Sequence, residues 1–208
     1  MSLQLTDDQL DLLKEVFNLG VGRAAASLSK LANNKYEVVL SLPKLQILPL
    51  RDMVSILETE SNNNITCVSQ NYTGPFNGTA HMIYSHAASL RLVTMMLDSN
   101  VPSERLSELE SDALMEIGNV LINACLGALS RMFKAEIETE LPQILSGTPE
   151  NVFKKGHPNF DLPVTFIRSE FQIKEENLKG YISLFLETDK IQKLLEMIDQ
   201  YNQELMGM

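Results

Sequence analysis

The chain has 208 residues, enough for one medium domain or two small ones with a hydrophobic core. It carries 27 acidic and 17 basic residues, and a net charge of -10 argues against a nucleic-acid-binding surface, which needs clustered lysine and arginine. Cys67 and Cys125 are too few for a disulfide framework and are expected to lie in the core. The chain opens on a helix start at Thr6, and no signal peptide or membrane span is expected, so a cytoplasmic location is predicted.

Hydrophobic periodicity and turn residues predict the elements in chain order. In the first half they are a helix from Asp7 to about Asn33, strands at Glu37–Leu42, Val54–Glu60, Ile65–Tyr72 and Phe76–Tyr84, and a helix at Ala87–Leu97. In the second half they are a helix at Ser107–Phe133, strands at Ala135–Glu140, Val164–Ile173 and Lys179–Glu187, and a helix at Lys190–Gln203 capped by Asp189. The stretch Ser146–Asp161, rich in Gly, Pro and Asn, is expected to be a surface loop.

The two halves repeat one pattern. Gly78–Tyr84 resembles Gly180–Leu186 at an offset of 102 residues. The string D-x-x-x-E-x-x-N occurs twice at an offset of 101, as Asp11, Glu15 and Asn18 and again as Asp112, Glu116 and Asn119. These repeats predict a single α/β (α+β) domain over residues 1–208. It would be a pseudo-two-fold duplication of an α-β-β-β-α-type unit, with halves at about 1–100 and 101–208.

In each copy the Asp, Glu and Asn side chains fall on one face of a helix, because positions i, i+4 and i+7 lie within about 40° of one another. Asn123 extends the second row. A solvated helix face is the ordinary interpretation of such a row. Its recurrence favours a retained site, since exposed positions usually diverge and asparagine is a poor residue for a helix interior.

The residue types narrow the chemistry. There is no Ser-His-Asp arrangement and no phosphate-binding glycine loop of the G-x-x-x-x-G-K-[ST] type. One Glu and one Asn seldom hold a metal ion by themselves. A carboxamide carries both a donor and an acceptor, so it can orient a water molecule in line with a phosphoryl group.

The second row resembles the motif of the CheC, CheX and FliY phosphatases, [D/S]-x3-E-x2-N-x22-P, because Pro142 follows Asn119 after 22 residues. In the first copy Pro43 follows Asn18 after 24 residues, and Phe17 stands where the family commonly has glycine. Phe17 either crowds an approaching partner or packs into the core, and the sequence leaves both open. Two motifs fit the CheC branch better than CheX, whose subunits carry one.

The resemblance implies two long exposed helices on a continuous β-sheet, and a phosphatase acting on the phosphoaspartate of a CheY-like response regulator. Asn18 and Asn119 would align the hydrolytic water, and Glu15 and Glu116 would contact the regulator's active-site lysine. Asp11, Asp112, Pro43 and Pro142 would be supporting motif positions. The chain would need no cofactor of its own, since the regulator would supply Mg²⁺.

Other roles stay open at this stage. The chain could be a non-catalytic CheC-like adaptor that binds CheD or a regulator, or a protein associated with the flagellar switch. The two retained Glu and Asn pairs favour the phosphatase.

Overall fold

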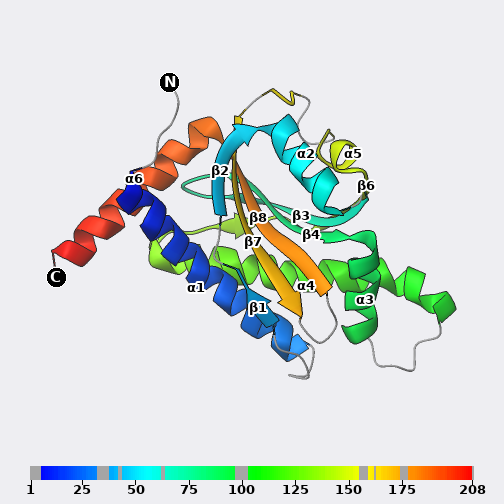
Figure 1. Ribbon diagram of the computed structural model, residues 1–208. Helices are drawn as coiled ribbons and strands as arrows, with labels where there is room; N and C mark the ends of the chain where they lie inside the picture. The colour runs from blue at the N-terminus through cyan, green and yellow to red at the C-terminus, as the bar shows by residue number, and fades with distance from the viewer. Residues whose placement is uncertain are drawn as a thin grey trace.

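The computed structural model describes residues 6–31, 38–41, 44–61, 64–96, 103–154, 159–161, 163–173 and 178–207 (Figure 1). Its helices are α1 (Asp7–Leu31), α2 (Leu50–Ser61), α3 (His86–Met96), α4 (Ser103–Met132), α5 (Pro149–Lys154) and α6 (Thr188–Met206). Its strands are β1 (Val38–Leu40), β2 (Lys44–Pro49), β3 (Ile65–Thr73), β4 (Gly78–Ser85), β5 (Glu138–Thr139), β6 (Gln143–Gly147), β7 (Pro163–Ile173) and β8 (Leu178–Glu187).

All eight strands join one antiparallel sheet in the order β1-β7-β8-β4-β3-β5. Strand β2 also pairs with β7, and β6 also pairs with β3. The two halves meet at the centre, where β4 pairs with β8 from Thr79–Phe185 to Tyr84–Gly180. The predicted mixed α and β fold on a continuous sheet is therefore confirmed.

The strand pairing keeps its form when the halves are exchanged. Strands β1 and β2 of the first half pair with β7 of the second, and β5 and β6 of the second half pair with β3 of the first. Leu48 pairs with Val164, and Gly147 and Ile65, which lie 99 residues from them in the chain, also pair with each other. Each outer strand thus crosses to the other half, as a pseudo-two-fold arrangement requires. The superposition of the two halves stays a prediction.

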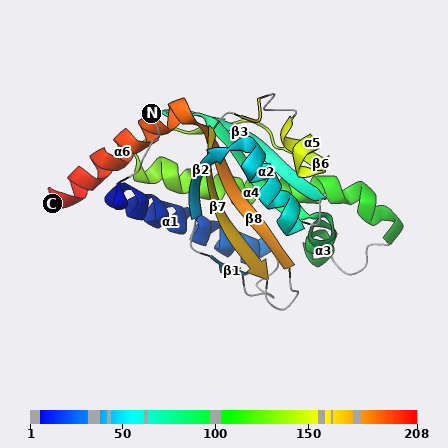
Figure 2. The same cartoon turned by 45° about the horizontal axis from the view of Figure 1, so that its top comes forward.

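Helices cover both faces of the sheet. Helices α1 and α4 lie side by side and antiparallel on one face, and α2 and α5 lie on the other (Figures 1 and 2). The close approach of α1 to α4 is made at Gly20, where an added Cβ would stand 3.2 Å from the Cα of Cys125. Helix α3 of the first half contacts α4 of the second, and α6 of the second half contacts α1 of the first, so the helix contacts follow the same pseudo-two-fold pattern.

Buried side chains fill the space on both faces of the sheet. Between the sheet and α2 with α5 lie Leu50, Met53, Leu57, Phe153 and Phe166 among others. On the α1 and α4 side the buried positions follow the helical period, and they include Val16, Phe17, Leu114, Ile117, Leu121 and Cys125. One side of each long helix is therefore apolar, and the opposite side is left to solvent.

The strand predicted at Val54–Glu60 is wrong, because this segment lies in α2. Leu50, Met53, Val54 and Leu57 are all buried, and their spacing of i, i+3, i+4 and i+7 is helical. Ser55, between two of them, is exposed. The sequence-based interpretation took a short run of apolar and β-branched residues for a strand and missed the period set by residues further upstream.

The surface loop predicted at Ser146–Asp161 is also wrong in part. Strand β6 reaches Gly147, and α5 then buries Pro149, Val152 and Phe153. The Thr148 hydroxyl accepts a hydrogen bond from the backbone N–H of Asn151 at 3.3 Å, as an N-cap does, with proline at the first helical position. The Pro and Gly that indicated a loop instead mark the start of a short helix.

Two smaller differences concern element ends. Strand β2, which ends at Pro49, was not predicted, and its alternating Leu45, Gln46 and Ile47 are the signal that would have found it. Helix α6 begins at Thr188, so Asp189 lies in its first turn and not at the N-cap position that the sequence predicted.

Helix α4 contains a segment, Leu109–Met132, that is long and apolar enough to cross a membrane by length and composition alone. This differs from the sequence-based expectation that no such run exists. Half of its most apolar window is buried inside the fold. Packing against the sheet and α1 accounts for its hydropathy, as in the core helix of a soluble protein.

Gly118 of α4 tests how closely this helix approaches the sheet. A Cβ at Gly118 would stand 2.5 Å from Cγ1 of Val68 on β3, whereas a Cβ at Gly22 of α1 would meet nothing within 4 Å. We expect Gly118→Ala to lower the free energy of unfolding by about 1–3 kcal/mol through overpacking. The matched Gly22→Ala should raise it by about 0.5–1 kcal/mol, because alanine is the better helix former. Urea denaturation of both variants measures the difference, and equal stabilities would contradict this packing.

The two cysteines are both buried, as predicted. Burial raises the pKa of the Cys125 thiol to about 12 and also raises the pKa of Cys67. A raised thiol pKa keeps the unreactive protonated form at neutral and mildly alkaline pH. We expect a disulfide reagent at pH 8 to label neither thiol in the native protein and both in guanidinium chloride. Rapid labelling of the native protein would contradict the burial.

Candidate functional site

The second polar row lies on the solvent side of α4. Asp112 and Glu116 are exposed, and Asn119 is half-buried one turn further along. Leu114 and Ile117, on the other side of the same turns, are buried against the sheet. The helix therefore presents a carboxylate and a carboxamide together on its accessible face.

The first polar row lies in the same way on α1. Asp11, Glu15 and Asn18 are all exposed, and Val16 beside them is buried. The Asp11 carboxylate accepts a hydrogen bond from Lys14 at 2.9 Å. Neither Glu15 nor Asn18 has an ion pair or side-chain hydrogen bond within the described chain, so both remain available to a partner.

The two rows point to opposite ends of one helical layer. Helices α1 and α4 cross near Gly20 and Cys125 and run in opposite directions (Figure 1). Asn18 precedes the crossing on α1, and Asn119 precedes it on α4. The rows therefore form two separate surfaces, and neither completes the other.

Asn119 is held by a hydrogen-bond network that the sequence did not reveal. Its Oδ1 accepts from Asn123 Nδ2 at 2.6 Å and from Gln70 Nε2 at 3.3 Å. Gln70 also donates to the backbone carbonyl of Glu140 at 2.8 Å, and Asn123 accepts from the Thr139 hydroxyl at 3.2 Å. The network joins α4 to β3 and to the segment that leads into Pro142.

Gln70 is the site residue that sequence reasoning missed. It lies on β3, is 2% exposed, and lies 49 residues from Asn119 in the chain. A buried glutamine in a strand is unusual, because glutamine is mostly exposed in proteins. Gln70 lies in phase with the buried Val68 and Tyr72, and that alternation was the signal available, but no pattern along one strand indicates which helix lies above it.

The question left open at Phe17 is resolved by its position. Phe17 is 6% exposed and packs with Leu12 and Val16 in the core, so it does not crowd the face that carries Asn18. Its counterpart Gly118 is buried as well, against Val68. Both residues beside the two asparagines therefore point inward.

Pro142, the proline of the second motif, lies just after the segment that contacts β3. Pro142 is half-buried and follows Leu141, which is 87% exposed. Two hydrogen bonds hold Glu140 to Asn71. The backbone N–H of Glu140 donates to the backbone carbonyl of Asn71 at 3.0 Å, and the Asn71 side-chain amide donates to the Glu140 carboxylate at 2.9 Å. Pro43 lies outside the described residues.

Other candidate chemistry is sparse in the part of the chain that the structure describes. No group of three or more His, Cys, Asp or Glu side chains there is placed to hold a metal ion. His81 is buried beside Cys67, with 3.5 Å between Nδ1 and Sγ, and lies far from solvent. The remaining accessible chemistry is that of the two Glu and Asn pairs.

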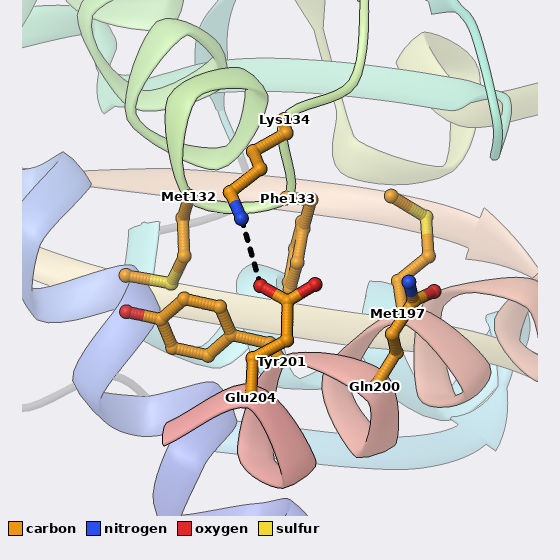
Figure 3. A pocket seen from close by; sticks show the side chains of 7 residues that line it. All are labelled: Met132, Phe133, Lys134, Met197, Gln200, Tyr201 and Glu204. Atoms are coloured by element: carbon orange, nitrogen blue, oxygen red, sulfur yellow. Dashed lines mark hydrogen bonds and ion pairs between the residues drawn. The ribbon is translucent and has the colours of Figure 1, made fainter. Parts of the chain in front are cut away.

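A pocket of about 190 Å³ lies between the end of α4 and α6, and Figure 3 shows the side chains that line it. Lys134 spans it with an ion pair to Glu204 at 2.8 Å, and this hydrogen bond raises the pKa of Lys134. None of its lining residues belongs to either polar row, and we assign no activity to it. They are Met132, Phe133, Lys134, Met197, Gln200, Tyr201 and Glu204.

Comparison with known sequences finds distant relatives. No family model matches the chain. It is 22% identical over 143 residues to the CheY-P phosphatase CheC of Bacillus subtilis (strain 168), a match that covers 67% of each protein. It is 22% identical over 142 residues to the flagellar motor switch phosphatase FliY of the same organism, of which it spans only 36%.

Solved structures share the fold. Thermotoga maritima FliY matches 96% of the chain with a TM-score of 0.76 at 19% identity and is itself covered completely. The FliM middle domain of Helicobacter pylori matches 93% of the chain and 99% of its own, with a TM-score of 0.65 at 10% identity. A chain of the CheX-CheY-BeF3-Mg²⁺ complex from Borrelia burgdorferi matches 83% of the chain and 95% of its own, with a TM-score of 0.54 at 12% identity. The predicted resemblance to CheC, CheX and FliY is therefore confirmed in sequence and in fold.

Proposed function

We propose that this relative of the CheC, CheX and FliY proteins removes the phosphoryl group from the phosphoaspartate of a CheY-like response regulator. The observation that carries the proposal is the recurrence of an accessible Glu one turn from an Asn. The pairs are Glu15 with Asn18 on α1 and Glu116 with Asn119 on α4. Both belong to the one helical layer, and both are clear of the core.

The relatives of this chain support a role in chemotaxis, and the reaction itself is our proposal. The CheC relative is named as a phosphatase of CheY-P, and the CheX structure is a complex with CheY, BeF3 and Mg²⁺. Both facts concern those proteins. The CheX structure shares the fold of this chain, which makes a CheY-like protein the natural partner to test.

The proposed reaction needs no nucleophile or metal ion from this chain. The oxygen of a water molecule forms a bond to phosphorus, and the bond from phosphorus to the aspartyl oxygen breaks. The carboxylate leaves with the electron pair, and both protons of the water leave with inorganic phosphate. The Asn amide would orient the water, and the Glu would bind the lysine of the regulator, whose Mg²⁺ would neutralise the phosphoryl charge.

An adaptor role is the second candidate, because the fold is also that of FliM middle domains. In that role the chain would bind a regulator, CheD or the flagellar switch without turnover. We place either activity in the cytoplasm. Phosphate release separates the two roles, because only the phosphatase increases it.

We expect Asn119→Ala to slow dephosphorylation more than Asn18→Ala, and the double variant to approach the rate without added protein. Each site should lose on the order of 10²-fold in rate when its water is no longer oriented. The second site should contribute more, because its amide is held by Gln70 and Asn123 whereas Asn18 has no partner within the described chain. Phosphate release from a phosphorylated CheY-like protein measures all three rates.

The matched control is Asn151→Ala. Asn151 is exposed on α5, across the sheet from both rows, so its loss should leave the rate unchanged. Circular dichroism verifies that each variant folds. A folded double variant with full activity would refute the mechanism, and a larger loss at Asn18 would overturn only the ranking.

The metal dependence is a separate expectation. A Glu and an Asn offer too few ligands for the six-fold shell of Mg²⁺, so titration calorimetry of the chain alone should detect no tight stoichiometric binding. Phosphate release should still require Mg²⁺ when the regulator is present. Tight binding by the chain alone that is lost in Glu116→Ala would place a metal site here and contradict this division of roles.

A further inference from the structure

We infer that Gln70 is a positioning residue that fixes the Asn119 amide with its N–H group outward, so that the second site offers a hydrogen-bond donor. The inference rests on the proposed function and specifies how its second site works. Gln70 lies below the helix, 2% exposed, and cannot itself reach a docked partner.

The orientation of Gln70 is set by a group that cannot be reversed. Its Nε2 is 2.8 Å from the backbone carbonyl oxygen of Glu140, which can only accept. Turning the amide over would place two acceptor oxygens at that distance. The observed orientation holds although it leaves Gln70 Oε1 buried and without a partner in the described structure. The same Nε2 lies 3.3 Å from Asn119, so Asn119 must present its oxygen there.

Asn123 adds the second constraint. Its Oδ1 accepts from the Thr139 hydroxyl at 3.2 Å, and its Nδ2 donates to Asn119 Oδ1 at 2.6 Å. A carboxamide oxygen has two lone pairs, and here both are engaged. Asn119 Nδ2 donates to no group that the structure describes, which leaves its two N–H bonds for a ligand.

A donor in this position suits an attacking water. An N–H bond directed at the water oxygen engages one lone pair and leaves the other for phosphorus. The first site lacks this control, because Gly22 stands where the second has Asn123. Gln172 of β7 lies next to Ile173, which packs on the α1 and α4 side, so Gln172 faces the other side of the sheet and does not support Asn18.

Two substitutions test the role in a background of Asn18→Ala, where only the second site can act. Gln70→Met keeps the length of the side chain and removes both donors. It should lower kcat for phosphate release by about 10–100-fold while KM for the regulator changes by less than about twofold. Asn119→Asp keeps an oxygen for Gln70 and Asn123 but has no N–H bond, so it should fold and lose as much activity as Asn119→Ala.

The matched control is Gln172→Met in a background of Asn119→Ala, where we expect no change in the activity of the first site. An unchanged kcat in Gln70→Met, or an Asn119→Asp variant as active as its parent, would overturn the inference. So would an equal loss from Gln172→Met, because it would indicate a general effect of strand substitutions.

A measurement without the regulator separates this inference from the proposed function. In the free ¹⁵N-labelled protein, the side-chain N–H₂ of Gln70 should exchange slowly with solvent and that of Asn119 rapidly, with assignments from Gln70→Met and Asn119→Ala. Slow exchange at Asn119 would overturn the orientation whatever the activity. If the wild type releases no phosphate, the proposed function fails, and the exchange rates still decide whether Gln70 orients Asn119.

Discussion

The pairing of β4 with β8 is the interaction on which the rest of the molecule depends. It joins the two halves into one sheet, and that sheet supports α1 and α4 side by side. Without this pairing, β4 and β8 would each be an unpaired strand edge, and α1 and α4 would not share one sheet. The buried polar pair His81 and Ser183 lies within this junction, among apolar neighbours such as Met82 and Leu184. The two candidate sites therefore owe their common setting to a strand pairing in which neither polar row takes part.

What the sequence could predict depended on how local the signal was. The long helices and the polar rows follow from periods within one element, and so do strands β3, β7 and β8. The strand predicted at Val54–Glu60 failed because a short apolar run fits a strand and a helix equally well until Leu50 and Met53 are counted. The network at Asn119 could not be predicted, because Gln70 and Thr139 reach it from other strands through tertiary packing. The sequence around a residue predicts which face of its helix or strand carries the side chain. Only the tertiary fold determines which side chains of other elements contact it.

The two copies solve one packing problem in different ways. On α4 the helix approaches β3 so closely that Gly118 has no room for a side chain beside Val68. On α1 the equivalent position carries Phe17, whose ring fills the space between helix and sheet. The close helix is also the one whose asparagine is reached from the strand beneath it. Divergence in the core has thus changed how each accessible row is supported, although the Asp, Glu and Asn identities are the same.

The crossed pairing of the outer strands has a consequence for synthesis on the ribosome. Val38 pairs with Ile173, and Lys44 with Arg168. Strands β1 and β2 are synthesised first, but they cannot pair until β7, near the end of the chain, has been synthesised. Contacts of such long sequence separation form late, because closing the loop costs entropy before any pairing is gained. The hairpin of β3 and β4 can form alone, but β1 and β2 cannot. The nascent first half therefore leaves apolar strands unpaired until translation is nearly finished, and a truncated chain would expose them to aggregation.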